Sequence, residues 1–180
     1  MRNGSKRMRS VAILDAGPLV AAADVSDPGH GGSAGVLRRQ DLDLVIPSLV
    51  MGEATYIIGA RFGPKKEVDF LRALDRFVIE PPIDEDWPTI ADLLERYADF
   101  PLGTADAATI VLADRLETDL IVTLDRRHFA AVQSPKGSHF RLLPEALSVH
   151  EEPAPYAAQG ADRPRITAIG VAQGETSCRS

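Results

Sequence analysis

The sequence is poor in cysteine, in basic residues relative to acidic ones, and in long apolar runs. Its single cysteine, Cys178, excludes an intrachain disulfide and a cysteine-based zinc site, and is typical of a reducing compartment. Lys and Arg number 20 against 26 Asp and Glu, and the resulting net charge of −6 argues against binding of nucleic acid through bulk basicity. No stretch reaches the ~20 apolar residues that a membrane span requires.

The composition that remains is that of a globular protein. A chain of 180 residues with 44% hydrophobic and 26% charged residues fits one domain and excludes wholesale disorder. The charge is unevenly placed: residues 1–10 carry four basic and no acidic side chains, whereas residues 11–144 carry 13 basic and 21 acidic ones. Proline and glycine interrupt residues 145–180. We expect a basic N-terminal extension over 1–10, a folded domain over 11–144 and a mobile tail over 145–180.

The N-terminus imitates a secretory signal, because a basic start is followed by the apolar stretch VAILDAGPLVAAA. Asp15 lies inside that stretch, and a carboxylate there costs about 2.5–3.5 kcal/mol on membrane-insertion scales. We therefore expect a cytoplasmic protein that does not enter a membrane.

Short apolar, β-branched runs alternate with helical patterns, which predicts an α/β domain with a mostly parallel sheet of four to five strands. The runs are too uniformly apolar for a sheet with one exposed face, so helices should cover both faces in a three-layer α/β/α sandwich. The expected strands are 11–15, 44–46, 77–79, 120–123 and 140–143, and the expected helices are 17–24, 33–40, 48–61, 65–76, 84–97 and 104–116.

Two further details of the helices can be predicted. Ser48 and Thr104 each precede a helical pattern and are expected to cap it through their hydroxyl groups. Val68, Leu71 and Leu74 recur at a spacing of three residues within the helix expected over 65–76.

Four acidic residues are placed where a parallel sheet would bring them together. Asp15 ends the first strand and Asp125 closely follows the fourth. Asp106 lies in the first turn of the helix before that fourth strand, and Glu53 about one and a half turns into the helix after the second strand. Since ligands bind beyond the carboxyl ends of parallel strands, the four acids converge if the first and fourth strands are neighbours.

Each of these acids also has a purely structural interpretation. Asp15 could fix the following turn, Asp106 could interact with the helix dipole, and Asp125 could cap a short helix over 126–130. Glu53 could belong to a solvated helix face. The four taken together favour a functional site, since clustered carboxylates repel one another unless a cation compensates. Hard oxygen ligands suit Mg²⁺ or Mn²⁺, and such a site promotes attack of water on a phosphodiester.

Four sequence blocks in order resemble the PIN-domain family, specifically the VapC ribonuclease toxins of VapBC toxin–antitoxin pairs. The blocks are LDAGPLVAA, PSLVMGEATY, YADFPLGTADAATIVLADRL and IVTLDRRHF, and the resemblance covers about residues 11–144. Residues 1–7 look additional to the family pattern, which makes Met8 an alternative to Met1 as the start. The tail is also longer than is usual in the family.

The resemblance implies a function and a site. Asp15, Glu53, Asp106 and Asp125 match the catalytic and metal-binding acids of the family, and Thr123 matches its usual supporting Thr or Ser. By the same likeness we expect an Mg²⁺-dependent endoribonuclease (Mn²⁺ being an alternative) that cuts RNA. We also expect a homodimer and inhibition by a VapB-like antitoxin.

Arg126 and Arg127 directly follow one of the acids and are candidates for binding the RNA phosphate. Two other enzyme classes with aspartates at strand ends fit poorly. A haloacid-dehalogenase-like phosphatase needs an acid where this chain has Gly17, and a phospho-accepting receiver domain needs paired acids where Asp15 is followed by Ala16. A PIN-fold partner-binding module without nuclease activity stays open as the alternative.

Overall fold

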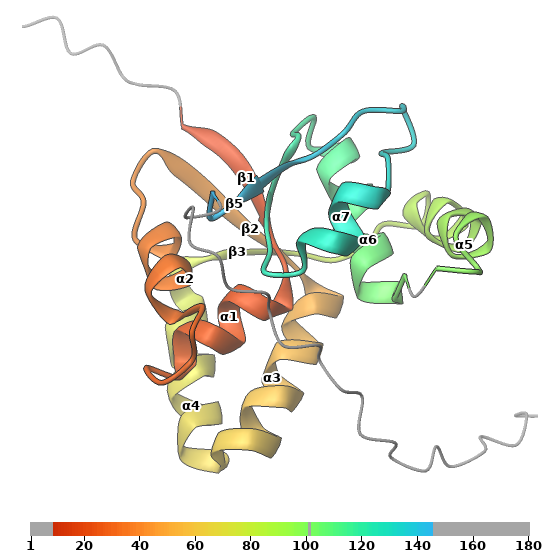
Figure 1. The fold of residues 1–180 in the computed structure, drawn as a ribbon. Helices are drawn as coiled ribbons and strands as arrows, with labels where there is room; N and C mark the ends of the chain where they lie inside the picture. The colour runs from red at the N-terminus through yellow and green to blue at the C-terminus, as the bar shows by residue number, and fades with distance from the viewer. Residues whose placement is uncertain (1–8, 101, 146–180) are drawn as a thin grey trace, which may run out of the picture. The chain divides into compact units, whose positions relative to one another are not determined.

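The computed structural model describes residues 9–100 and 102–145 (Figure 1). Its strands are β1 (Ser10–Leu14), β2 (Leu42–Pro47), β3 (Val78–Glu80), β4 (Leu120–Val122) and β5 (Arg141–Leu143). Its helices are α1 (Ala16–Ala23), α2 (His30–Leu37), α3 (Ser48–Phe62), α4 (Pro64–Ala73), a 3-10 turn (Leu74–Arg76), α5 (Asp86–Arg96), α6 (Thr104–Arg115) and α7 (Arg126–Ala131). The expectations about Met1, Met8 and the tail from residue 146 lie outside the described residues.

The five strands form one sheet in the order β3-β2-β1-β4-β5, and every pairing within it is parallel. The expected α/β fold is therefore confirmed, with a purely parallel sheet. β1 lies between β2 and β4, and Leu14 pairs with Val122 at the ends of β1 and β4. The first and fourth strands are thus neighbours, which is the condition on which the convergence of the acids depends.

Alternating side chains of the strands point into two separate hydrophobic layers. Ala12 and Leu14 of β1 pack in a cluster with α1, α2 and α3, whereas Ile13 packs with Leu112 of α6. Ile121 of β4 joins a third cluster built with α5, α6 and α7. Both faces of the sheet are covered, as expected of a three-layer α/β/α sandwich, and this explains why the strands read as continuous apolar runs.

The two expected helix caps are wrong. Pro47 is the N-cap of α3 and Ser48 is already its first helical residue, without a capping hydrogen bond from the cap side chain. Gly103 is the N-cap of α6, and its N–H donates to the carboxylate of Asp106 at 2.9 Å. The helix start is therefore stabilised by the Asp106 carboxylate, which accepts from the Gly103 N–H, and not by the Thr104 hydroxyl.

The apolar residues that recur every three positions along α4 differ in their burial. Val68 and Leu71 are 43% and 45% exposed, and only Leu74, beyond the end of α4, is buried. A spacing of three residues rotates each position by about 60° around a helix with 3.6 residues per turn. Three residues spaced in this way span about 120° of the helix surface, and on this segment only the Leu74 end is buried.

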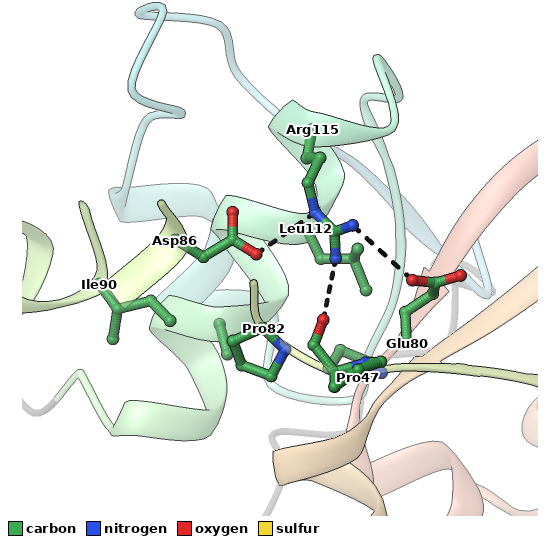
Figure 2. Close-up of a pocket in the computed structure, with 9 residues that line it drawn as sticks. Pro47, Glu80, Pro82, Asp86, Ile90, Leu112 and Arg115 are labelled. Carbon is green, nitrogen blue, oxygen red and sulfur yellow. Dashed lines mark hydrogen bonds and ion pairs between the residues drawn. The ribbon is translucent and has the colours of Figure 1, made fainter. Parts of the chain in front are cut away.

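A cluster of charged groups ties the edge strand β3 to the helical layer (Figure 2). The guanidinium of Arg115, at the end of α6, lies 3.3 Å from Asp86 and 3.7 Å from Glu80, and donates to the carbonyl of Pro81 at 3.1 Å. Asp86 is buried and Arg115 is partly buried. This cluster holds the segment between β3 and α5 against α6.

None of the helices in residues 9–100 and 102–145 is long and apolar enough to cross a membrane.

Candidate active site

Asp15 is the most buried of the predicted site acids and is held at the start of α1. It is the N-cap of that helix, where one carboxylate oxygen accepts from the N–H of Ala16 at 2.6 Å. The other oxygen accepts from the hydroxyl of Thr123 at 2.7 Å. Burial raises the pKa of Asp15 to about 6 against the opposing effect of the Thr123 hydrogen bond, and the Asp106 and Glu53 carboxylates raise it further.

Asp106 approaches Asp15 from the other layer. It lies in the first turn of α6, where it accepts from the Gly103 N–H. Burial raises its pKa, although that hydrogen bond and the nearby His128 ring lower it, and Asp125 contributes repulsion. The structural interpretation of Asp106 as a helix-terminal acid therefore holds alongside its place in the cluster.

Glu53 completes the group from α3. Its side chain is exposed, yet partial withdrawal from water and the Asp106 carboxylate both raise its pKa. Asp15, Glu53 and Asp106 thus repel one another across the junction of α1, α3 and α6. None of the ion pairs in the described part of the chain involves any of these three carboxylates.

Asp125 lies at the edge of the cluster and is engaged by α7. As the N-cap of α7, it accepts from the backbone N–H of His128 at 3.1 Å, and its second oxygen lies 2.9 Å from Nδ1 of the His128 ring. The predicted capping role is therefore present. The Thr123 hydroxyl accepts from the Asp125 N–H at 2.9 Å while donating to Asp15. One hydroxyl thus connects the two acids that follow neighbouring strands.

The sequence interpretation did not assign His128 to the acids. Its position three residues after Asp125 on a short helix is the signal that places its ring beside that carboxylate. The His128 ring also makes an edge-to-face contact with the ring of Phe100, and the two centroids lie 5.1 Å apart. Arg126 donates instead to the carbonyl of Pro144 at 2.9 Å, and Arg127 is exposed.

The donor chemistry of this cluster fits a divalent cation. Its members are hard carboxylate oxygens, and mutual repulsion and burial disfavour their ionised forms unless positive charge is supplied. Among the described residues no three His, Cys, Asp or Glu side chains are close enough to form a complete ligand set. The acids converge, but they do not by themselves define a coordination geometry.

A family model described as the PIN domain matches residues 12–134. The chain belongs to the PIN-domain family. Over 138 residues it is 33% identical to "Ribonuclease VapC26" of Mycobacterium tuberculosis, which spans 73% of this chain and 99% of that relative. Residues 12–134, which the family model matches, contain all four acids and Thr123.

Two solved structures share the fold of this PIN domain. The crystal structure of VapC20 of Mycobacterium tuberculosis, a toxin that cleaves the sarcin–ricin loop, matches with a TM-score of 0.56 and 15% identity over 61% of this chain and 86% of that one. VapBC2 from Rickettsia felis, bound to a DNA fragment from its promoter, matches with a TM-score of 0.55 and 17% identity over 73% and 96% of the two chains.

Proposed function

We propose that this PIN domain is the ribonuclease toxin of a VapBC-type toxin–antitoxin pair, and that it cuts RNA phosphodiesters in the cytoplasm with the help of Mg²⁺. The observation that carries the proposal is the convergence of Asp15, Glu53 and Asp106 at the junction of α1, α3 and α6, where none of the three forms an ion pair with another described residue. The likeness to Ribonuclease VapC26 supports RNA as the substrate.

The chain's own groups have distinct roles in this proposal. Asp15, Asp106, Asp125 and Glu53 would hold the cation, with Mn²⁺ as an alternative to Mg²⁺. When bound, the cation activates water and stabilises the departing oxygen. Thr123 fixes the orientation of Asp15 through its 2.7 Å hydrogen bond, and together with the Ala16 N–H it leaves one lone pair on each oxygen of that carboxylate for a cation. The low-dielectric surroundings of Asp15 strengthen its attraction for positive charge.

The proposal is tested by cleavage of RNA with Mg²⁺, with EDTA, and with Asp15→Asn and Asp106→Asn variants. We expect cleavage to require the metal and to fall by at least about 100-fold in either variant, as is usual when electrostatic groups of a reaction centre are removed. Asp119→Asn is the matched control, because Asp119 is an exposed acid paired with Arg141. Cleavage that persists in EDTA, or that survives both substitutions, would refute a metal-dependent nuclease.

Binding of the ion can be measured separately from cleavage. A ligand that binds only the folded state stabilises it by about 2.7 kcal/mol at 100 times its Kd. We expect Mg²⁺ to raise the Tm of the wild-type chain and of Asp119→Asn, and to have little effect on Asp15→Asn.

We also propose a VapB-like antitoxin as partner, since the structural relatives include a VapBC complex. Expression of the chain alone should arrest growth, and co-expression of a small DNA-binding protein encoded beside it should relieve the arrest and co-purify with it. A homodimer is proposed as well, and light scattering of the purified chain tests it. Normal growth on expression would remove the toxin assignment and leave the fold unaffected.

For the RNA phosphate we retain Arg126 and Arg127 as proposed contacts. Arg127 is the better placed of the two, because the Arg126 guanidinium already donates to Pro144. Arg127→Ala should raise KM with little change in kcat.

A PIN-fold binding module without nuclease activity is the second candidate. The lack of a complete ligand set among the described side chains favours it. A wild-type chain that cleaves no RNA with Mg²⁺ or Mn²⁺, while still capturing the antitoxin, would establish this alternative.

A further inference from the structure

Tyr56 is an exposed aromatic side chain next to the acidic cluster. It is 77% exposed, which makes it the most exposed aromatic residue in the part of the chain that the structure describes. Within residues 9–100 and 102–145, no hydrogen bond, ion pair or ring contact holds it there. A ring exposed to this extent keeps most of its surface available for contact with another molecule.

The helical geometry of α3 places Tyr56 beside Glu53. Three residues separate them, which corresponds to a rise of about 4.5 Å and a rotation of about 60°, so both project from the same face. The neighbours one turn away on either side are Gly52 and Ala60. Both are exposed, and a Cβ added at Gly52 would meet nothing within 4 Å. Neither of these two neighbours carries a side chain large enough to cover the Tyr56 ring.

The charges of this region leave little ionic attraction for a nucleic acid. Glu53, Asp106 and Asp15 repel one another, and their pKa values are raised rather than lowered by the surroundings. The nearest basic residue of α3, Arg61, is rotated about 140° from Tyr56 around the helix and lies over the Phe62 ring. Lys66 donates to the carbonyl of Ala23. On this face of α3 a substrate therefore gains from a contact that is not ionic, in addition to the cation and Arg127 proposed above.

We propose that Tyr56 is a stacking platform for an unpaired base of single-stranded RNA beside the bond that is cut. The inference rests on the proposed function, because it takes RNA as the substrate of the acidic cluster. Base–aromatic stacking supplies affinity without phosphate contacts, and it accepts any base because each has a π-face. Tyr56 is a substrate-positioning residue in this proposal, and the acids carry the chemistry.

The test uses the full-length chain with Asp15→Asn, which prevents cleavage, and a short unstructured fluorescent oligoribonucleotide. Loss of one stacked base corresponds to about a 5- to 100-fold weaker Kd. We expect this loss for Tyr56→Ala and for Tyr56→Leu, which keeps apolar bulk without a π-system. Tyr56→Phe should bind within about 2-fold of the parent, since it retains the ring. An oligonucleotide with abasic sites should bind all four proteins equally.

Trp87→Ala is the matched control for loss of an exposed aromatic. Trp87 is 46% exposed and follows Asp86, which is tied to Arg115 at the far end of α6 from Asp106. Nine residues of helix separate Arg115 from Asp106, or about 13 Å. We expect its RNA affinity to equal that of the parent.

Three results would overturn the inference. The first is an unchanged Kd in Tyr56→Ala or Tyr56→Leu. The second is an equal loss of binding to the abasic oligonucleotide. The third is a change in oligomeric state or antitoxin capture by Tyr56→Ala with RNA affinity intact, which would assign this face to a protein partner. If Tyr56 fails while wild-type cleavage with Mg²⁺ stands, only the stacking role is lost; a wild-type chain that neither binds nor cuts RNA removes the proposed function as well.

Discussion

At the scale of single residues, one hydroxyl organises the two acids that follow neighbouring strands. The Thr123 side chain donates to Asp15 and accepts from the backbone N–H of Asp125. Thr123 is itself 1% exposed, so neither hydrogen bond is shared with bulk water. The raised pKa of Asp15 is thus the net result of strong burial and partial compensation by this hydroxyl.

Asp15 should make the metal-free protein less stable as the pH rises. Its pKa of about 6 in the folded chain exceeds the ordinary value of 3.8, so folding favours the protonated carboxyl. This stabilisation is fully present below pH 3.8 and is lost as the pH rises through 6, at a cost of about 3 kcal/mol. Urea unfolding in EDTA should show that loss in the wild type and a smaller one in Asp15→Asn. Parallel pH profiles of the two proteins would contradict the assignment.

Thr123→Val should affect both stability and the pH dependence of cleavage. Losing the hydroxyl leaves Asp15 with the Ala16 N–H as its remaining hydrogen bond and should cost about 1–3 kcal/mol of unfolding free energy. The pKa of Asp15 should rise, so the acidic limb of the cleavage profile should move to higher pH. Thr123→Ser should restore both properties.

The control is Thr109→Val, because the Thr109 hydroxyl is buried but donates to the carbonyl of Ala105 within α6. This variant should lose stability and keep the wild-type pH profile. A Thr123→Val protein with an unshifted profile would show that the hydroxyl does not act through Asp15.

At the scale of elements, the starts of three helices bring the acids to one place. Asp15 caps α1, Asp106 lies in the first turn of α6, and Asp125 caps α7. Each therefore satisfies backbone donors and interacts favourably with a helix dipole. These local interactions fix the acids in position although their mutual repulsion opposes it.

The cluster around Arg115 stabilises the packing of the segment between β3 and α5 against α6 and has no role in the proposed reaction (Figure 2). Arg115→Met should lower the free energy of unfolding by about 3 kcal/mol, because it leaves the largely buried Asp86 without its charged partner. Chemical denaturation measures this effect. Arg141→Met, which breaks the exposed pair with Asp119, should cost at most about 1 kcal/mol. Equal effects of the two substitutions would show that the Arg115 cluster contributes no more than a surface ion pair.

At the scale of the whole molecule, the excess of negative charge limits how the protein can bind RNA. The net charge is −6, and the acidic excess lies in the folded region that carries the site. Long-range attraction for a polyanion is therefore weak, and few phosphates can be neutralised.

The salt dependence of RNA binding should be correspondingly small. Each neutralised phosphate of a single strand contributes about −0.7 to the slope of log K against log salt concentration. With up to three such contacts we expect a slope no steeper than about −2, measured by anisotropy with Asp15→Asn. A much steeper slope would reveal an extended basic path and would weaken the argument for stacking on Tyr56.

Local sequence patterns could predict most of the fold and the identity of the acids. The alternation of apolar runs and helical patterns indicated the α/β class, and the positions of Asp15 and Asp125 after strands indicated one edge of a sheet. The predictions about the helix caps were wrong. The caps at Ser48 and Thr104 were wrong because neighbouring residues took the capping positions.

By itself, the sequence determined which residues could carry chemistry and, through its apolar strands, that they would be supported by a sheet covered on both faces. Only the tertiary structure decided which of them meet. The placement of β1 beside β4, the hydrogen bond from Thr123 to Asp15, and the ring of His128 against Asp125 all join residues through space, and no local pattern specifies how long-range packing combines them. The same holds for Tyr56, whose exposure depends on the elements that leave that face of α3 uncovered.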